Sequence, residues 1–318
     1  MDWNTRVTQL LEIDYPIIQG GLAHLAYSDL AAAVSNAGGL GQITAMSLPG
    51  PESLKMEIRR VKQMTDKPFG VNFAIGQHGR PFEEMVKVAV EEKVPAISVT
   101  GGNPKGVLDM VKGEPIKTLV LVAARRQAIK AEELGADAVM VVGQEGGGHL
   151  GRSDTGTFVL TPQVSDDVSI PVIASGGIVD GKGLMAALAL GAEGIEMGTR
   201  FIATEECLAA HEIYKKAILE ADEEDTVVIK RSIGAPARAL KNEWTGKILQ
   251  LEEQNVGYER LKDYISGEAN KNYIIKGKEH EGFGWAGQSA ARIHDLPPVH
   301  TLISDIINEA EEIRNKWN

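Results

Sequence analysis

The sequence predicts an α/β protein built as a (β/α)8 TIM barrel, with a small helical cap inserted after the eighth strand. Short runs rich in β-branched residues alternate with helix-like runs, and turn residues separate them, which is typical of parallel strands joined by crossover helices. Eight strands and their helices are complete by about residue 219, so the 318-residue chain has room for one barrel. No G-x-G-x-x-G motif follows the first strand, which disfavours an open dinucleotide-binding sheet.

The strands and helices are expected in strict alternation. We expect strands at Tyr15–Gln19, Leu40–Ala45, Pro68–Ile75, Ala96–Thr100, Lys117–Ala123, Asp137–Val142, Pro171–Ala174 and Gly194–Met197. We expect helices at Asp29–Asn36, Glu52–Met64, Phe82–Lys93, Arg125–Leu134 and Asp180–Leu190, and a short helix that ends at Lys112. Pro51 and Asp180 are ordinary helix-start signals, since proline suits the first helical turn and aspartate suits the N-cap.

The composition changes after the eighth strand. The following stretch is polar, shows no strand alternation after Lys230, and contains helix-like pieces around Lys241–Gln254 and Tyr258–Ser266. From Leu302 to Ile313 apolar residues recur at helical spacing, which predicts an amphipathic final helix. We therefore assign residues 1–225 to the barrel, 226–282 to a helical cap, and 283–318 to a C-terminal segment and helix that pack back on the barrel.

Charge and composition exclude several classes of protein. The chain has 33 Lys and Arg against 44 Asp and Glu, a net charge of −11, which opposes binding to nucleic acid or to an anionic membrane surface. Cys207 is the only cysteine, and the histidines show no ligand spacing, so we expect no disulfide and no metal site. No apolar run approaches membrane-spanning length. We expect a soluble, cytoplasmic enzyme with a small-molecule substrate, and the sequence leaves a homodimer open.

Glycines end the seventh and eighth strands. Ser175, Gly176 and Gly177 follow the seventh strand, and Gly198 and Thr199 follow the eighth. In a (β/α)8 barrel, backbone N–H groups at these two strand ends can hold a phosphate. The alternative is that the glycines only form tight turns. Because both neighbouring strands end in this way, the pattern favours a phosphate site.

The loop after the sixth strand, Gly143–Gly151, reads G-Q-E-G-G-G-H-L-G. Its glycines, Gly147 and Gly148 among them, cost backbone entropy, so a structural turn alone explains them poorly. They allow the main chain to approach a flat ligand, and they carry His149, whose side chain suits proton transfer near neutral pH. A histidine that merely bonds the loop is the alternative. Its place at the carboxyl end of a barrel strand favours a catalytic role.

Two further positions suggest contact with a planar ligand. Asn72 lies inside an apolar strand, where a buried amide needs hydrogen-bond partners, so it could bond the polar edge of a ring. A core asparagine bonded to a neighbouring loop is an equally good interpretation. Gly20, Gly21 and Leu22 follow the first strand, and the two glycines permit close approach of the backbone.

Together these motifs resemble the nitronate monooxygenase (2-nitropropane dioxygenase) family, which includes enoyl-ACP reductase II and NADH:quinone reductase members. The motifs are Tyr15-Pro-Ile-Ile-Gln-Gly-Gly21, Val34-Ser-Asn-Ala-Gly-Gly-Leu-Gly41, Phe69-Gly-Val-Asn72, Glu145-Gly-Gly-Gly-His149, Pro171-Val-Ile-Ala-Ser-Gly-Gly-Ile178, Met197-Gly-Thr-Arg200 and Ala286-Gly-Gln288. The resemblance covers nearly the whole chain and implies an FMN-dependent barrel. It implies that His149 is the catalytic histidine and that FMN is surrounded by Gly20, Gly21, Asn72, Gly147, Gly176, Gly177, Gly198 and Thr199.

The resemblance leaves two activities. The first, which is the leading hypothesis from the sequence, is oxidation of alkyl nitronates or nitroalkanes by O2, with His149 as the base and with Gly147 and Gly148 N–H groups stabilising developing charge. The second is an NAD(P)H-dependent reductase that acts on quinones or enoyl-ACP. The family loop more often reads E-A-G-G-H, whereas this chain has Gly146 in place of alanine. The compact length and the Gly-Thr-Arg-Phe201 ending of strand eight resemble the reductase members more closely.

A third class, the IMP dehydrogenase type, shares the phosphate pattern of strands seven and eight. Its chemistry needs a cysteine nucleophile in the loop after strand six. The loop Gly143–Gly151 contains no cysteine, which counts strongly against this class.

Overall fold

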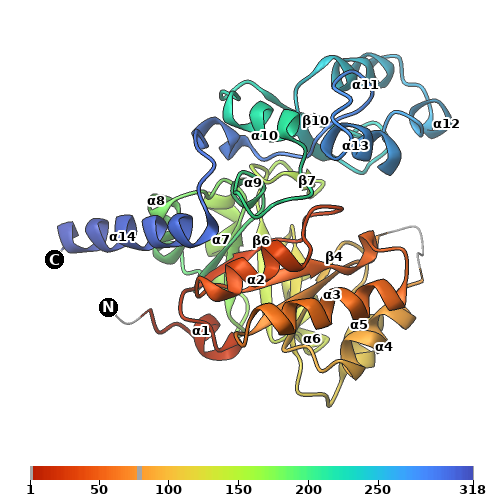
Figure 1. Cartoon of the computed structure of the whole chain (residues 1–318). Helices are drawn as coiled ribbons and strands as arrows, with labels where there is room; N and C mark the ends of the chain where they lie inside the picture. Colours follow the sequence, from red (N-terminus) through yellow and green to blue (C-terminus); the bar gives the residue numbers. More distant parts are fainter. Residues whose placement is uncertain (1–2, 77–80, 318) are drawn as a thin grey trace.

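The computed structural model describes residues 3–76 and 81–317, and it places eight parallel strands in one barrel (Figure 1). The strands are β1 (Ile17–Gln19), β2 (Gly41–Thr44), β3 (Phe69–Ala74), β4 (Ala96–Thr100), β5 (Lys117–Val122), β6 (Ala138–Val142), β8 (Val172–Ser175) and β9 (Gly194–Met197). They pair in the order β1-β9-β8-β6-β5-β4-β3-β2. A parallel bridge between Ile18 and Leu40 joins the two ends of this order. The predicted (β/α)8 barrel is therefore confirmed.

Helices lie outside the strands, and all but the first come after β1 in the chain. They are α1 (Arg6–Leu11), α2 (Ser28–Asn36), α3 (Pro51–Met64), α4 (Glu83–Glu91), α5 (Lys105–Val111), α6 (Arg125–Glu133), α7 (Thr157–Ser165), α8 (Gly181–Ala189), α9 (Thr199–Ile202) and α10 (Glu212–Leu219). The 3-10 turn η1 (Ala45–Ser47) follows β2. The sequence did not predict α7, because it contains β-branched residues and an internal proline, Pro162, all of which lower helix propensity.

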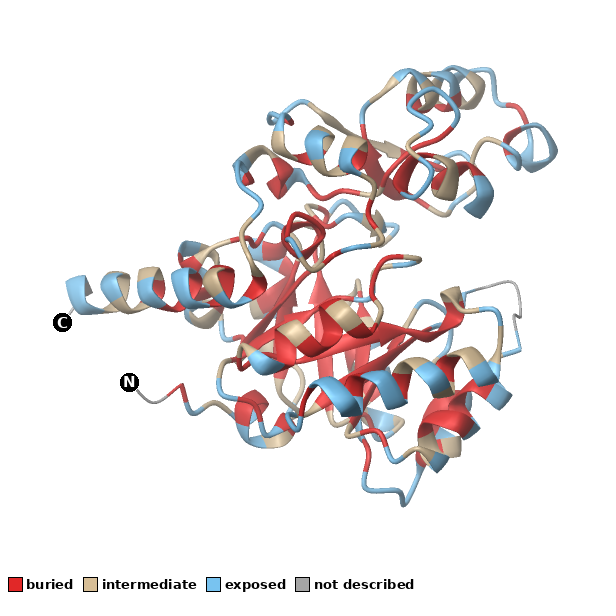
Figure 2. Cartoon of the chain, viewed as in Figure 1, coloured by how far each residue is buried: buried red, intermediate tan, exposed pale blue. Residues whose placement is uncertain are grey.

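The barrel interior is apolar at one end and polar at the other. Helix α1 contributes Val7 and Leu11 to a buried cluster with Ile18, Met140 and Ile173, so it covers the amino-terminal end of the strands. Near the carboxyl ends the buried residues are polar instead, among them Gln42, Asn72, Ser98, Ser175 and Glu196. Figure 2 shows the strands as buried along their length, with exposed residues on the outer helices. A functional site is therefore expected at the carboxyl ends.

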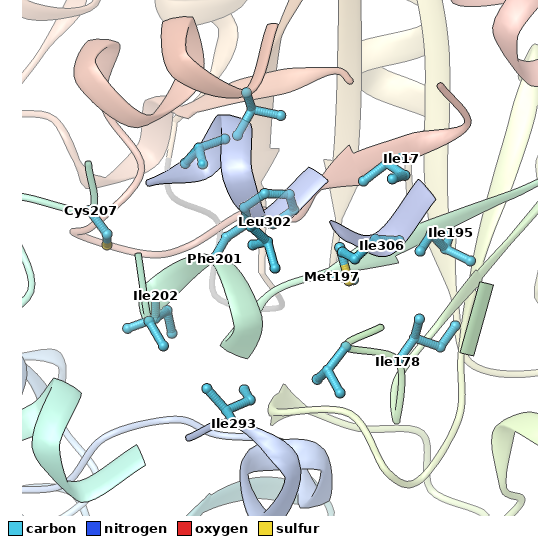
Figure 3. Close-up of a cluster of buried hydrophobic side chains, with 14 of the residues drawn as sticks. Ile17, Ile178, Ile195, Met197, Phe201, Ile202, Cys207, Ile293, Leu302 and Ile306 are labelled. Atoms are coloured by element: carbon cyan, nitrogen blue, oxygen red, sulfur yellow. The ribbon is translucent and has the colours of Figure 1, made fainter. Parts of the chain in front are cut away.

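The C-terminal helix α14 (Val299–Trp317) packs against the barrel through the predicted apolar face. Its Leu302 and Ile306 lie in one cluster with Ile17, Ile195 and Met197 on the outer faces of β1 and β9 (Figure 3). At the start of α8, a Cβ on Gly181 would lie 2.5 Å from the backbone N of Ala310, so only glycine permits this close crossing of α8 and α14. The apolar spacing of this helix was thus a signal of core packing.

The elements between β9 and α14 lie over one end of the barrel (Figure 1). They include β10 (Thr226–Ile229), β11 (Ala237–Leu240), α11 (Glu243–Glu253), α12 (Tyr258–Leu261), α13 (Gly267–Ile274) and the 3-10 turn η2 (Gln288–Arg292). Phe283 and Ile248 belong to a separate buried cluster in this region. In the described part of the chain, no helix is both long and apolar enough to cross a bilayer.

The prediction that strand alternation ceases after Lys230 is wrong. Strand β11 pairs antiparallel with β10 and with β7 (Gly148–His149), the two-residue strand in the glycine-rich loop. The sequence of β11, Ala-Arg-Ala-Leu, contains no β-branched or aromatic residue, and tertiary pairing overrides its weak strand propensity. The cap region therefore contains a small sheet that includes His149.

Candidate active site

A polar layer lies just beneath the carboxyl ends of the strands. Asn72 Nδ2 donates to Ser98 Oγ at 2.9 Å, and Ser98 Oγ donates to Gln42 Oε1 at 2.5 Å. Gln42 Nε2 in turn donates to the backbone oxygen of Gln19 at 2.7 Å. The Asn72 amide nitrogen is thus bonded to a side chain of the neighbouring strand β4 and not to a loop. A Cβ on Gly21 would collide with Asn72 Oδ1, so β1 and β3 meet closely here.

Glu196 is the buried carboxyl of this layer. A Cβ on Gly20 would lie 3.0 Å from Glu196 Oε1, and Ser175 is hydrogen-bonded to the carboxyl group. Burial raises the pKa of Glu196 above its usual value, and the Ser175 hydrogen bond opposes that shift only in part. Burial therefore favours the neutral form of this carboxyl group more than in an exposed glutamate. The sequence shows an acidic residue in this strand, but the strand pattern gave no reason to predict that its side chain faces the interior of the barrel.

The glycine turns after β8 and β9 provide free backbone donors. Gly176 and Gly177 have φ of +90° and +79°, which side chains rarely adopt, and a Cβ on Gly176 would lie 3.0 Å from Gly146 N. Within residues 3–76 and 81–317 we find no protein acceptor for the N–H groups of Gly177, Gly198 and Thr199. Free donors on neighbouring strand ends fit the phosphate of a cofactor such as FMN.

The returning C-terminal segment closes against both loops. Thr199 Oγ1 accepts a hydrogen bond from Gly287 N at 2.9 Å. A Cβ on Gly147 would lie 2.7 Å from both Ala286 C and Gly287 N, so the glycine-rich loop lies directly on this segment. The Ala286-Gly-Gln288 motif therefore joins the turn after β9 to the glycine-rich loop after β6.

Leu22 and Gly148 are two further residues predicted to bind the cofactor; Leu22 contacts its neighbours, whereas Gly148 borders open space. Leu22 N donates to Thr44 Oγ1 at 3.0 Å, and its side chain lies near Gly198, where a Cβ would be 3.4 Å from Leu22 Cδ2. Gly148 has open space on its Cβ side. Leu22 is thus placed between the ends of β2 and β9, and Gly148 contributes unoccupied room beside His149.

His149 lies where the barrel meets the cap region. It pairs with Ala237 of β11, and its ring centroid is 5.8 Å from that of Trp285. Lys230, directly after β10, places Nζ 2.9 Å from His149 Nε2. His149 is exposed in its loop. Desolvation by the surrounding chain, followed by the charge of Lys230, lowers the pKa of its imidazole below the usual value. Both effects favour the neutral form of the ring.

Lys230 determines which histidine nitrogen can donate. Its own pKa is lowered, chiefly by burial, while Glu252 opposes the shift. An ammonium group has three donors and no lone pair, so a protonated Lys230 donates to His149 Nε2, and the proton of a neutral ring then lies on Nδ1. Sequence reasoning missed Lys230 because it lies 81 residues from His149 in a polar stretch. The one signal in the sequence was that Lys230 directly follows the apolar run Thr226–Ile229, which places it at the end of a strand.

The structure thus brings most of the predicted site residues to the carboxyl ends of the strands. In the described residues, no group of three or more His, Cys, Asp or Glu side chains is placed to hold a metal ion. The arrangement combines free backbone donors, a polar layer and one neutral imidazole.

Comparison with known proteins agrees with this arrangement. A "Probable nitronate monooxygenase" of Staphylococcus saprophyticus is 33% identical over 99% of this chain and 100% of that protein. A protein of the same description from Staphylococcus aureus is 34% identical over 98% of this chain and 99% of its own length.

Solved structures are similar over the whole length. FabK from Thermotoga maritima has a TM-score of 0.90 and 42% identity, covering 99% of this chain and 98% of that one. A nitroalkane oxidase from Streptomyces ansochromogenes has a TM-score of 0.85 and 28% identity, covering 98% and 99%. The nitronate monooxygenase family model matches residues 4–79 and 74–309, and the chain is an oxidoreductase that belongs to this family.

Proposed function

We propose that this chain is an FMN-dependent oxidoreductase whose cofactor phosphate binds the free N–H groups after β8 and β9. The residues that would surround the cofactor are Gly20, Gly21, Leu22, Asn72, Gly147, Gly148, Ser175, Gly176, Gly177, Gly198 and Thr199. Bound FMN would accept and deliver a hydride. The unpartnered donors of Gly177, Gly198 and Thr199 support the phosphate position.

Of the two activities left by the family resemblance, we favour the reductase. In this proposal NAD(P)H reduces the flavin, and an enoyl thioester or a quinone is the acceptor. The carrying observation is that Lys230 Nζ lies 2.9 Å from His149 Nε2. A protonated Lys230 occupies that nitrogen and leaves Nδ1 as the position for the ring N–H group. Protonation of a reduced acceptor needs a donor, whereas abstraction of a proton from a nitroalkane needs a free lone pair. The 42% identity to FabK (enoyl-ACP reductase II) supports the same choice.

Nitronate oxidation is the second candidate, favoured by the full-length similarity to probable nitronate monooxygenases. In that reaction the Nδ1–H group of His149 would bind a nitronate oxygen. The predicted role as a base for neutral nitroalkanes would require Lys230 to release Nε2, so the geometry favours substrates that are already ionised.

We further propose that residues 226–282 cover the substrate side of the site and set substrate size. Strand β11 of this segment pairs with β7, and Lys230 contacts His149. Shortening this segment is therefore expected to change KM and acceptor preference more than FMN retention.

Anaerobic stopped-flow spectroscopy of the FMN-loaded protein distinguishes the candidates. Flavin bleaching by NADH or NADPH, with no bleaching by propyl-2-nitronate, is the result expected for a reductase. Bleaching by the nitronate alone would contradict it and establish the second candidate. Reoxidation by crotonyl thioester and by a quinone, compared in the same instrument, would then identify the acceptor.

A further inference from the structure

Lys230 has an unusual backbone for a lysine. It directly follows β10 with φ of +68°, in the left-handed region that favours glycine. Its N donates to Glu252 Oε2 at 2.8 Å, and its O accepts from Ala235 N at 3.2 Å. A strained conformation that its neighbours hold in place is a frequent feature of functional sites. Lysine at this position therefore needs an explanation in terms of its side chain.

The side chain of Lys230 is directed to His149. Only 8% of Lys230 is exposed, and its Nζ lies 2.9 Å from His149 Nε2 and 5.7 Å from the Trp285 ring centroid. Burying a lysine is costly unless its ammonium group is bonded. Since the carboxylate of Glu252 is bonded to the Lys230 backbone, the imidazole is the polar side chain that Nζ contacts.

The charged side chains on the surrounding elements are bonded to other groups and do not compete for the contact between Lys230 and His149. Glu252 of α11 binds backbone N–H groups, and Glu145 accepts from Thr157. Arg238 of β11 donates to Gln144 O and to Thr226. Arg231 pairs with Asp154 at 2.8 Å. None of these side chains has a hydrogen bond to the imidazole of His149 in the described part of the chain.

We propose that Lys230 is a positioning residue that fixes His149 as the Nδ1–H tautomer and replaces the proton that His149 gives to substrate. The inference rests on the proposed reductase function. A neutral imidazole that loses its only proton would become an imidazolate, which is unfavourable, unless a second proton arrives at the other nitrogen. Lys230 is placed to supply that proton.

The proton transfers balance as follows. After hydride delivery, the electron pair of the substrate α-carbanion forms a C–H bond as the Nδ1–H bond of His149 breaks. The Nζ–H bond of Lys230 breaks while an Nε2–H bond forms on His149. The histidine is neutral before and after, and Lys230 becomes a neutral amine that takes a proton from solvent. Return of the histidine to the Nδ1–H tautomer completes the cycle.

The tautomer can be tested independently of any activity. Long-range 1H–15N spectra of histidine-labelled protein, with the His149 signals identified by their loss in His149→Asn, report which ring nitrogen carries the proton. The Nδ1–H tautomer is expected at pH 7 in the wild-type protein. A predominant Nε2–H tautomer would overturn the proposal, whether or not the protein reduces enoyl thioesters.

The kinetic test uses Lys230→Met, which keeps the length of the side chain but has no proton to give. Flavin reduction by NAD(P)H should be unchanged, and reoxidation by the enoyl thioester should slow by roughly tenfold or more at pH 8. Desolvation still lowers the pKa of His149 in this variant, but removing the positive neighbour raises it, so more of the imidazolium form is available as donor and the deficit should shrink towards pH 6. Lys230→Arg should retain the tautomer but transfer its proton poorly.

The matched control is Arg231→Met, which removes a neighbouring positive charge that pairs with Asp154 and not with His149. It should leave both half-reactions and the pH profile unchanged. If Lys230→Met slows reoxidation equally at every pH, or slows flavin reduction by the same factor, its role is structural. If NAD(P)H reduces the flavin of neither the wild-type protein nor the Lys230→Met variant, the proposed function fails. The tautomer measurement still decides the Lys230–His149 pairing.

Discussion

The barrel and the cap region divide the proposed work between them. The barrel supplies the free N–H groups of Gly177, Gly198 and Thr199, which suit cofactor binding. The cap region supplies Lys230, and its strand β11 holds His149 in a short sheet. Cofactor retention and proton transfer should therefore respond to different substitutions. A change in the barrel turns should empty the site, whereas a change at His149 should leave a loaded but slow enzyme.

The largest effect is expected at His149. His149→Asn should slow reoxidation of the reduced flavin by enoyl thioester roughly 10²- to 10⁴-fold, the range for loss of a general acid. Flavin reduction by NAD(P)H should be retained, because hydride transfer needs no protein acid. Stopped-flow measurement of the two half-reactions provides the check, with His300→Asn on the exposed side of α14 as a control. Equal loss in both half-reactions would indicate a disrupted cofactor site.

Substitution of Gly177 tests the barrel's contribution. Gly177→Leu forces a side chain into a backbone with φ of +79° and places its Cβ 3.3 Å from Glu145 Cβ. We expect FMN affinity to fall roughly 100-fold, equivalent to one or two charge-assisted hydrogen bonds. Fluorescence titration of the apoprotein with FMN measures the change.

Gly135→Leu is the matched control for this test. Gly135 has a similar φ of +88° and nothing within 4 Å of a Cβ, so its substitution introduces backbone strain away from the proposed site. Wild-type FMN affinity in Gly177→Leu, or an equal loss in Gly135→Leu, would refute the phosphate assignment.

The connection between the two regions can be weakened at Tyr214. The Tyr214 hydroxyl on α10 donates to the backbone oxygen of Trp285, whose ring contacts His149. Tyr214→Phe leaves that partly buried carbonyl without its Tyr214 donor, which costs about 1 kcal/mol in the free energy of unfolding. Urea unfolding measures this cost. We also expect a higher KM for the acceptor with unchanged FMN affinity, and a lower FMN affinity would contradict the division between barrel and cap.

The same division explains what the sequence could predict. Barrel strands such as β6 are continuous apolar runs rich in valine, because both faces of the strand are buried, so the sequence pattern of the strand alone is enough to predict it. Strand β11 contains two alanines and an arginine, and it is a strand only because β10 and β7 pair with it. His149 could be predicted from its glycine-rich loop. The contact with Lys230 joins distant segments, and no local pattern contains that information.

Asn72 shows a second limit of local reasoning. The sequence indicated a buried amide that needs partners, and the structure provides Ser98 for its nitrogen. Which partner a buried polar group takes depends on register between neighbouring strands, here Asn72 opposite Ser98. Glu196 was not predicted, because an acidic residue in a short strand gives no periodic signal.

The smallest effect is expected at Glu196, inside the barrel and away from the cap. Its pKa is raised by burial, so the folded protein binds this proton more tightly than the unfolded chain does. The stabilising contribution of the protonated group is fully present below the usual glutamate pKa. It declines as the pH rises from there towards the raised pKa of the folded state, because the unfolded chain releases the proton first.

Glu196→Gln replaces the carboxyl group by a neutral amide of similar shape that does not titrate. At pH 4 the two proteins should differ by less than about 1 kcal/mol in the free energy of unfolding, since both groups are then uncharged. As the pH rises towards 8, the difference should move in favour of the glutamine variant, because only the wild-type protein bears the cost of a buried acid. Urea unfolding at several pH values measures this trend. A variant that loses stability relative to the wild type as the pH rises would mean that Glu196 is ionised and paired in the folded protein, and the barrel interior would then hold a charge.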